Sequence, residues 1–81
     1  MALVHLSGDL RQRVGGQKLL EVEAGTVGEL VRAIEEQYPD ARSAGLPSMA
    51  VAIDGEVIPN AEYERLGPES EVHFLAAISG G

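Results

Sequence analysis

Residues 26–39 read TVGELVRAIEEQYP and carry the clearest structural signal in the chain. Thr26, followed three residues later by Glu29, is the pattern of a capping box, in which each side chain satisfies a backbone N–H group at the start of a helix. Apolar residues then recur at helical spacing and form one stripe, made of Val27, Leu30, Val31, Ile34 and Tyr38. Pro39 stops the helix after Tyr38. The stretch predicts an amphipathic helix with one face against a sheet.

Two strand-like segments precede this helix. Residues 2–7 (ALVHLS) are short and apolar. Residues 17–23 (QKLLEVE) alternate, with Leu20 and Val22 on one face and two glutamates on the other. Residues 8–16 (GDLRQRVGG) lie between them, with glycines at both ends, and predict a wide turn that contains one helical turn. We expect the two strands to form a hairpin.

Further strands follow the helix. After an expected loop at 39–48, residues 49–54 (MAVAID) alternate between large and small apolar side chains. Asp54-Gly55 is a strong hairpin signal, and residues 56–59 (EVIP) return as a short strand. An irregular connection at 60–70 is expected to be anchored in the core by Tyr63 and Leu66. Residues 71–78 (EVHFLAAI) form the last strand.

This order of elements predicts an α+β fold with a mixed sheet of four to five strands and one main helix packed on one face. If the first and last strands lie side by side in the centre, the fold is a β-grasp, or ubiquitin-like, roll. We expect residues 1–78 to form this domain and residues 79–81 (Ser-Gly-Gly) to be a flexible C-terminal tail.

Composition narrows the possible functions. The 81 residues include 13 acidic and 6 basic side chains, a net charge of -7, and no cysteine. Nucleic acid is a poor partner for an acidic surface, whereas a basic protein partner suits it, unless the acidity serves only solubility. The absence of cysteine excludes a disulfide framework and any thiol chemistry on a side chain. With no apolar segment of membrane-spanning length, we expect a cytoplasmic protein.

The last strand predicts a surface for a partner. Val72 and Phe74 should face the helix, which places a row of His73, Leu75 and Ala77 on the outer face of the sheet. Ala50 and Ala52 join this row if their strand is adjacent. Small apolar side chains on an open face suit a docking protein, although open sheets also carry such residues without a partner. His5 and His73 are interpreted as half-exposed neighbours on this face rather than as metal ligands.

Three stretches together resemble the MoaD/ThiS family of ubiquitin-like sulfur carriers: LVHLSGDLRQRVGG (3–16), TVGELVRAIEEQYP (26–39) and SEVHFLAAISGG (70–81). The resemblance covers the whole chain. In length and in its opening segment the chain is more similar to the molybdopterin synthase small subunit than to the shorter thiamin-pathway carrier.

The resemblance implies a chemistry on the C-terminal glycine. A MoeB/ThiF-like activating enzyme would use ATP to adenylate the carboxylate of Gly81, and a sulfur donor (a cysteine desulfurase or rhodanese-like protein) would convert it to a thiocarboxylate. Gly80 would supply backbone freedom, while Ile78 and Ser79 would contact the partners. The chain itself would be neither an enzyme nor a cofactor-binding protein. The acceptor would be an enzyme such as the molybdopterin synthase large subunit.

Two alternatives stay open at this point. The carrier could serve another pathway, such as thiamin, cysteine, tRNA thiolation or a secondary metabolite. Alternatively, the chain could be a ubiquitin-like modifier whose C-terminus forms isopeptide bonds with target lysines. Lys18 is the only lysine of the chain. If copies of the modifier were linked to one another, Lys18 would be the single possible attachment point.

Overall fold

The computed structural model describes residues 1–6 and 8–75. In chain order the elements are β1 (Ala2–His5), α1 (Gly8–Arg13), β2 (Leu19–Val22), α2 (Val27–Gln37), the 3-10 helices η1 (Pro39–Ala44) and η2 (Leu46–Ser48), β3 (Ala50–Ile53), β4 (Glu56–Ile58) and β5 (Glu71–Leu75). Among these described residues, no helix combines the length and the apolar character needed to cross a membrane.

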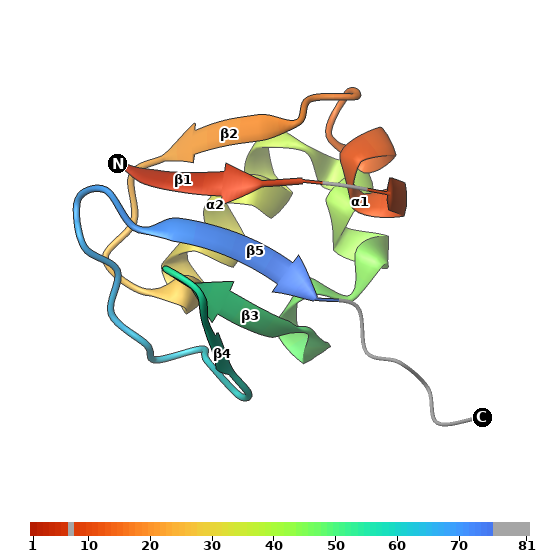
Figure 1. Cartoon of the computed structure of the whole chain (residues 1–81). Helices are drawn as coiled ribbons and strands as arrows, with labels where there is room; N and C mark the ends of the chain where they lie inside the picture. Colours follow the sequence, from red (N-terminus) through yellow and green to blue (C-terminus); the bar gives the residue numbers. More distant parts are fainter. Residues whose placement is uncertain (7, 76–81) are drawn as a thin grey trace.

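The five strands form one mixed sheet in the order β2-β1-β5-β3-β4. The first and last strands lie side by side in its centre and run parallel, while every other pair is antiparallel. Helix α2 packs behind one face, and the opposite face is open (Figure 1). The predicted β-grasp arrangement is therefore confirmed, including the central pairing that periodicity alone could not establish.

Helix α2 begins and ends as its sequence predicts. The Thr26 hydroxyl accepts a hydrogen bond from the Glu29 backbone N–H at 3.2 Å. The Glu29 carboxylate reaches back to the backbone N–H of Gly25 at 3.0 Å, one residue earlier than in the standard capping box. Leu30 and Ile34 are 0% and 1% exposed. The apolar stripe of α2 is thus the helical half of the core.

The turn between β3 and β4 also forms as predicted. Asp54 and Gly55 both adopt a positive φ, 49° and 88°. A two-residue hairpin with both central residues in this region matches the right-handed twist of the flanking strands, which explains the Asp-Gly pair. The turn sets the β3–β4 register, with Val51 opposite Ile58.

The prediction of a loop at 39–48 is wrong in one respect, because this segment forms the 3-10 helices η1 and η2. Each of these short helices has a proline in its first turn, Pro39 in η1 and Pro47 in η2, where the fixed φ of proline suits the helix. Ala41 and Leu46 are buried, so the segment closes one end of the core rather than running over the surface. The Arg13 guanidinium adds hydrogen bonds to the Asp40 carbonyl and the Ser43 hydroxyl.

The prediction that Tyr63 anchors the 60–70 connection is wrong, because its side chain is 85% exposed. The connection is held instead by the N-terminus of α2, whose first N–H groups have no partner within the helix. Val27 and Gly28 donate to the carbonyls of Glu64 and Glu62 at 3.0 and 2.8 Å. This backbone pairing leaves Tyr63 outside, while Ala61 is buried and Leu66, as predicted, packs on the core.

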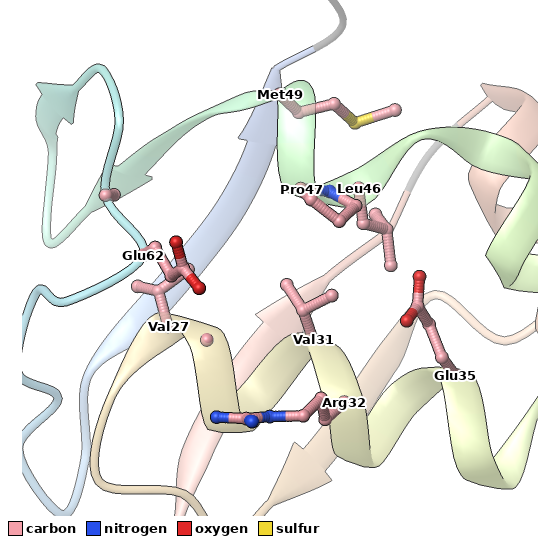
Figure 2. A pocket seen from close by; sticks show the side chains of 10 residues that line it. Val27, Val31, Arg32, Glu35, Leu46, Pro47, Met49 and Glu62 are labelled. Atoms are coloured by element: carbon pink, nitrogen blue, oxygen red, sulfur yellow. The ribbon is translucent and has the colours of Figure 1, made fainter.

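A groove of about 180 Å³ lies where α2 meets η2 and this connection (Figure 2). Val31 of α2 points across it toward Leu46 and Pro47, and Glu62 and Glu35 lie at its two sides. Gly28 forms part of the lining. A Cβ atom on Gly28 would stand 3.1 Å from both Cγ and the backbone oxygen of Glu62. The glycine therefore permits the close approach of the connection to the helix.

We expect Gly28→Ala to destabilise the fold by about 1–2 kcal/mol, because the added methyl group meets backbone that is already hydrogen-bonded to the same turn. In an open helix position the same change would stabilise by roughly 0.5–1 kcal/mol, so the sign itself is informative. Chemical denaturation measures it, with the exposed Glu36→Ala as the control on the same helix. A stabilised Gly28→Ala variant would contradict the contact.

Candidate functional site

One row of side chains crosses all five strands on the open face of the sheet. Strand pairing aligns its members in the order Leu19, His5, His73, Ala52 and Val57. The two ends of the row are strongly exposed, Leu19 at 44% and Val57 at 59%. The face is therefore apolar at both edges, with two imidazole rings at its centre.

The two histidines stack on each other, as expected for neighbours on the central strands. Their ring centroids lie 4.3 Å apart and their planes differ by 3°. Nε2 of His5 lies 3.0 Å from Oε1 of Glu71, which fixes the orientation of that ring. Within residues 1–6 and 8–75, no three His, Cys, Asp or Glu side chains are grouped in a way that could hold a metal ion.

The structure brings together four of the predicted surface residues. Ala52 pairs with His73, and Ala50 pairs with Leu75 one step further along the same two strands. Leu75 is 38% exposed, and both alanines are half-buried. The other five predicted residues, Ala77, Ile78, Ser79, Gly80 and Gly81, lie outside the described residues. The boundary expected between 78 and 79 lies there too.

Sequence reasoning missed the two edges of this face. Leu19 directly precedes Leu20. The alternation that places Leu20 and Val22 in the core therefore points Leu19 to the outer face. Val57 stands in a three-residue strand, too short for a pattern to show which way it points. Both directions are settled by register, since each pairs with an outward-facing neighbour.

The small side chains of Ala50 and Ala52 leave room for another surface to approach the sheet beside the two imidazole rings. Strand β5 is flanked on both sides by β1 and β3, and its last residue, Leu75, leads into residues 76–81 (Figure 1).

The sequence profile of the ThiS family matches residues 4–81. The chain belongs to the ThiS family. Its members are ubiquitin-like sulfur carriers, and the match includes both the open face and the last six residues. No curated protein matches this chain at a significant level of sequence similarity.

Solved structures share the fold of this ThiS-family chain. CysO in the BexX/CysO complex of Amycolatopsis orientalis is 19% identical, with a TM-score of 0.83 and full coverage of both chains. Mycobacterium tuberculosis CysO is also 19% identical, at 0.79, covering 96% of this chain and all of its own. Small archaeal modifier protein 1 of Methanosarcina acetivorans is 21% identical, at 0.81, with 99% and 95% covered. At these identities the likeness establishes the β-grasp fold.

Proposed function

We propose that this chain is a sulfur carrier that holds sulfur as a thiocarboxylate on Gly81. The observation that carries the proposal is the ThiS-family match, which runs to Gly81 and joins the Gly-Gly pair to a central strand of the β-grasp sheet. Six residues follow Leu75. Six extended residues reach at most about 20–22 Å, enough for a terminal carboxyl group to meet an active site in a partner.

The chemistry needs two steps, both on a partner enzyme. In the first, an oxygen of the Gly81 carboxylate attacks the α-phosphorus of ATP, pyrophosphate leaves, and a mixed anhydride with AMP forms. In the second, a thiol on a partner protein reduces the persulfide of a cysteine desulfurase or rhodanese-like donor, which forms a disulfide between the two cysteines and releases sulfide. The sulfide attacks the acyl carbon, a C–S bond forms, the C–O bond to AMP breaks, and the thiocarboxylate remains. Because the partner supplies ATP and the catalytic side chains, the carrier acts as a co-substrate.

Glycine at positions 80 and 81 suits this use. A tail that enters narrow active sites benefits from having no Cβ atom and from backbone angles that other residues avoid. The activating enzyme, of the MoeB/ThiF type, and the sulfur acceptor must receive the same group in turn. We propose that both dock on the open face around His73, Leu75, Ala50 and Ala52, with Ala77, Ile78 and Ser79 continuing the contact along the tail.

Leu75→Glu tests this docking surface. We expect binding to the activating enzyme to weaken by roughly tenfold or more, because a carboxylate replaces an apolar contact near the centre of the interface. The fold should persist, since Leu75 is already 38% exposed. Titration calorimetry measures the affinity. Tyr63→Glu is the matched control, because Tyr63 is exposed on the connection, away from the open face. Equal affinity for both variants would move the docking surface elsewhere.

We propose molybdopterin synthesis as the acceptor pathway to test first, on the resemblance of the chain to the molybdopterin synthase small subunit. The test mixes the thiocarboxylate form with a molybdopterin synthase large subunit and its sulfur-free pterin substrate. Transfer of sulfur to the pterin would support this pathway. Recovery of unchanged thiocarboxylate would exclude it while leaving the carrier function in place.

A protein modifier is the second candidate, and one observation favours it. Two of the similar solved structures, from Methanosarcina acetivorans and Haloferax volcanii, are named small archaeal modifier protein 1. A modifier would use the same adenylated Gly81 but pass its acyl group to a lysine amine, which expels AMP and forms an isopeptide bond. Intact-mass analysis after reaction in a lysate separates the two products. The mass of a carrier changes by the difference between one sulfur atom and one oxygen atom, whereas the mass of a modifier increases by that of a whole protein.

A further inference from the structure

One end of the open face is basic, although the chain as a whole is acidic. An open hollow beside Leu75 is lined by Arg11, Lys18 and both stacked histidines. The chain has only 6 lysines and arginines, and two of them lie in this hollow. The Arg11 guanidinium is fixed by a hydrogen bond from Nε to the Gly16 carbonyl at 2.8 Å. Lys18 is exposed at the start of the β2 segment.

The opposite end of the same face is acidic. Glu21 and Glu71 stand on either side of Leu3 in one cross-strand row. The Asp54 carboxylate adjoins them, because it accepts a hydrogen bond from the Glu71 backbone N–H at 2.9 Å. The histidine row lies between the two ends, and β1 and β5 both run from the acidic end to the basic end. Strand β5 therefore ends, at Leu75, at the basic end.

Local charge, not net charge, governs contact across a protein interface. At 0.1 M ionic strength, charges more than about 10 Å apart are largely screened from each other. The net charge of -7, which is the sum over the whole chain, therefore has little effect on contact at this end of the face. Near the base of the tail, the partner meets Arg11 and Lys18.

We propose that this polarity orients the activating enzyme on the open face. The partner that fits is a ThiF-type adenylating enzyme. Its docking surface would carry acidic side chains around the mouth of the channel that receives the tail, and basic side chains at the end opposite that channel. The inference rests on the proposed sulfur-carrier function and adds the charge pattern of the partner. A docking pose rotated by half a turn would place like charges together at both ends, so the pattern rejects poses that direct the tail away from the channel.

The test uses two charge-reversal variants, each with a matched control. For each variant we would measure the rate of association with the ThiF-type adenylating enzyme of the same organism. Lys18→Glu should slow association by roughly fivefold or more at low salt, and the loss should shrink at high salt. Arg42→Glu changes the net charge by the same amount, but Arg42 is exposed on η1, behind the sheet. It should have a much smaller effect. Glu21→Lys should also slow association more than Glu36→Lys, whose residue lies on the exposed side of α2.

Equal rates for Lys18→Glu and Arg42→Glu, or faster association of Lys18→Glu, would overturn the proposed polarity. Thiocarboxylate formation at saturating enzyme, followed by intact mass, keeps this outcome separate from the carrier function. A parent chain that forms the thiocarboxylate while the charge pairs show no difference retains the function and loses the polarity. A parent chain that neither binds nor reacts overturns both.

Discussion

Deletion of Gly81 is expected to abolish adenylation while leaving the fold unchanged. The shortened chain carries its carboxyl group on Gly80, withdrawn by one residue or about 3.5 Å. Reacting atoms must meet at near-contact distance, and a misplacement of even about 1 Å can cost a hundredfold in rate. ATP–pyrophosphate exchange with the activating enzyme measures the first chemical step directly. We expect exchange to fall to the background of the enzyme alone.

Two further variants distinguish the effect of the length of the tail from the effect of side-chain bulk within it. Gly80→Val keeps the length of the tail but adds a branched side chain, and we expect it to fail through collision with the channel wall. Addition of one glycine after Gly81 displaces the carboxyl group by the same distance in the other direction and should also fail. None of these changes touches the buried core, so all three should melt with the parent. Exchange at the parent rate by the Gly81 deletion would refute the mechanism.

Replacement of Ile34 by alanine is expected to lower the free energy of unfolding by about 2–4 kcal/mol. Ile34 is 1% exposed and lies on the face of α2 that packs behind the sheet, so truncation removes buried methyl groups and leaves a cavity. A domain of this size is stabilised by roughly 4–12 kcal/mol in total, so the loss is a large fraction.

Thermal unfolding measures this change as a fall in the midpoint. About 1 kcal/mol corresponds to roughly 4–8 °C for a domain of this length, so a fall of more than 8 °C is expected. Arg32→Ala is the control, because Arg32 is exposed on the same helix. Surface changes of this kind usually stay within about 0.5 kcal/mol. Similar midpoints for the two variants would show that α2 does not pack as described.

Local signals predicted the elements that depend on neighbouring residues alone. The Thr26–Glu29 pair and the apolar stripe located α2, and Asp54-Gly55 located the β3–β4 turn, because caps and tight turns are set within a few residues. The α+β class, with one main helix on one face of a mixed sheet, followed from the order of these elements. The central pairing of β1 with β5 needed the structure, since strand periodicity shows which faces are buried but not which strands are neighbours.

The misinterpreted residues depend on contacts between distant segments. Tyr63 is exposed because the backbone around it pairs with the first turn of α2, and no periodicity in the connection reveals that pairing. Gly28 allows close contact between α2 and Glu62, and a glycine within a helical pattern does not reveal such a contact. The expected loop at 39–48 contains buried Ala41 and Leu46, which no short-range pattern distinguishes from surface residues.

The candidate site likewise contains some residues that the sequence predicted and others that it did not. Alternation along the last strand placed His73 and Leu75 on the outer face, and register added Ala50 and Ala52 as predicted. The basic hollow was not predictable, because Arg11 and Lys18 come from different elements and meet beside Leu75 only in the folded chain. Net charge, the one electrostatic quantity available from sequence, has the opposite sign to this end of the face.

The central claim is that Gly81 carries sulfur, and the intact mass of the chain tests it most directly. The chain is incubated with its adenylating enzyme, ATP and a sulfur donor, and its mass is compared with that from a reaction without ATP. We expect the mass to increase by the difference between one sulfur atom and one oxygen atom, with the increase located on the C-terminal peptide and absent from the Gly81 deletion. An unchanged mass under conditions that support pyrophosphate exchange, or a gain that maps to any other residue, would contradict it.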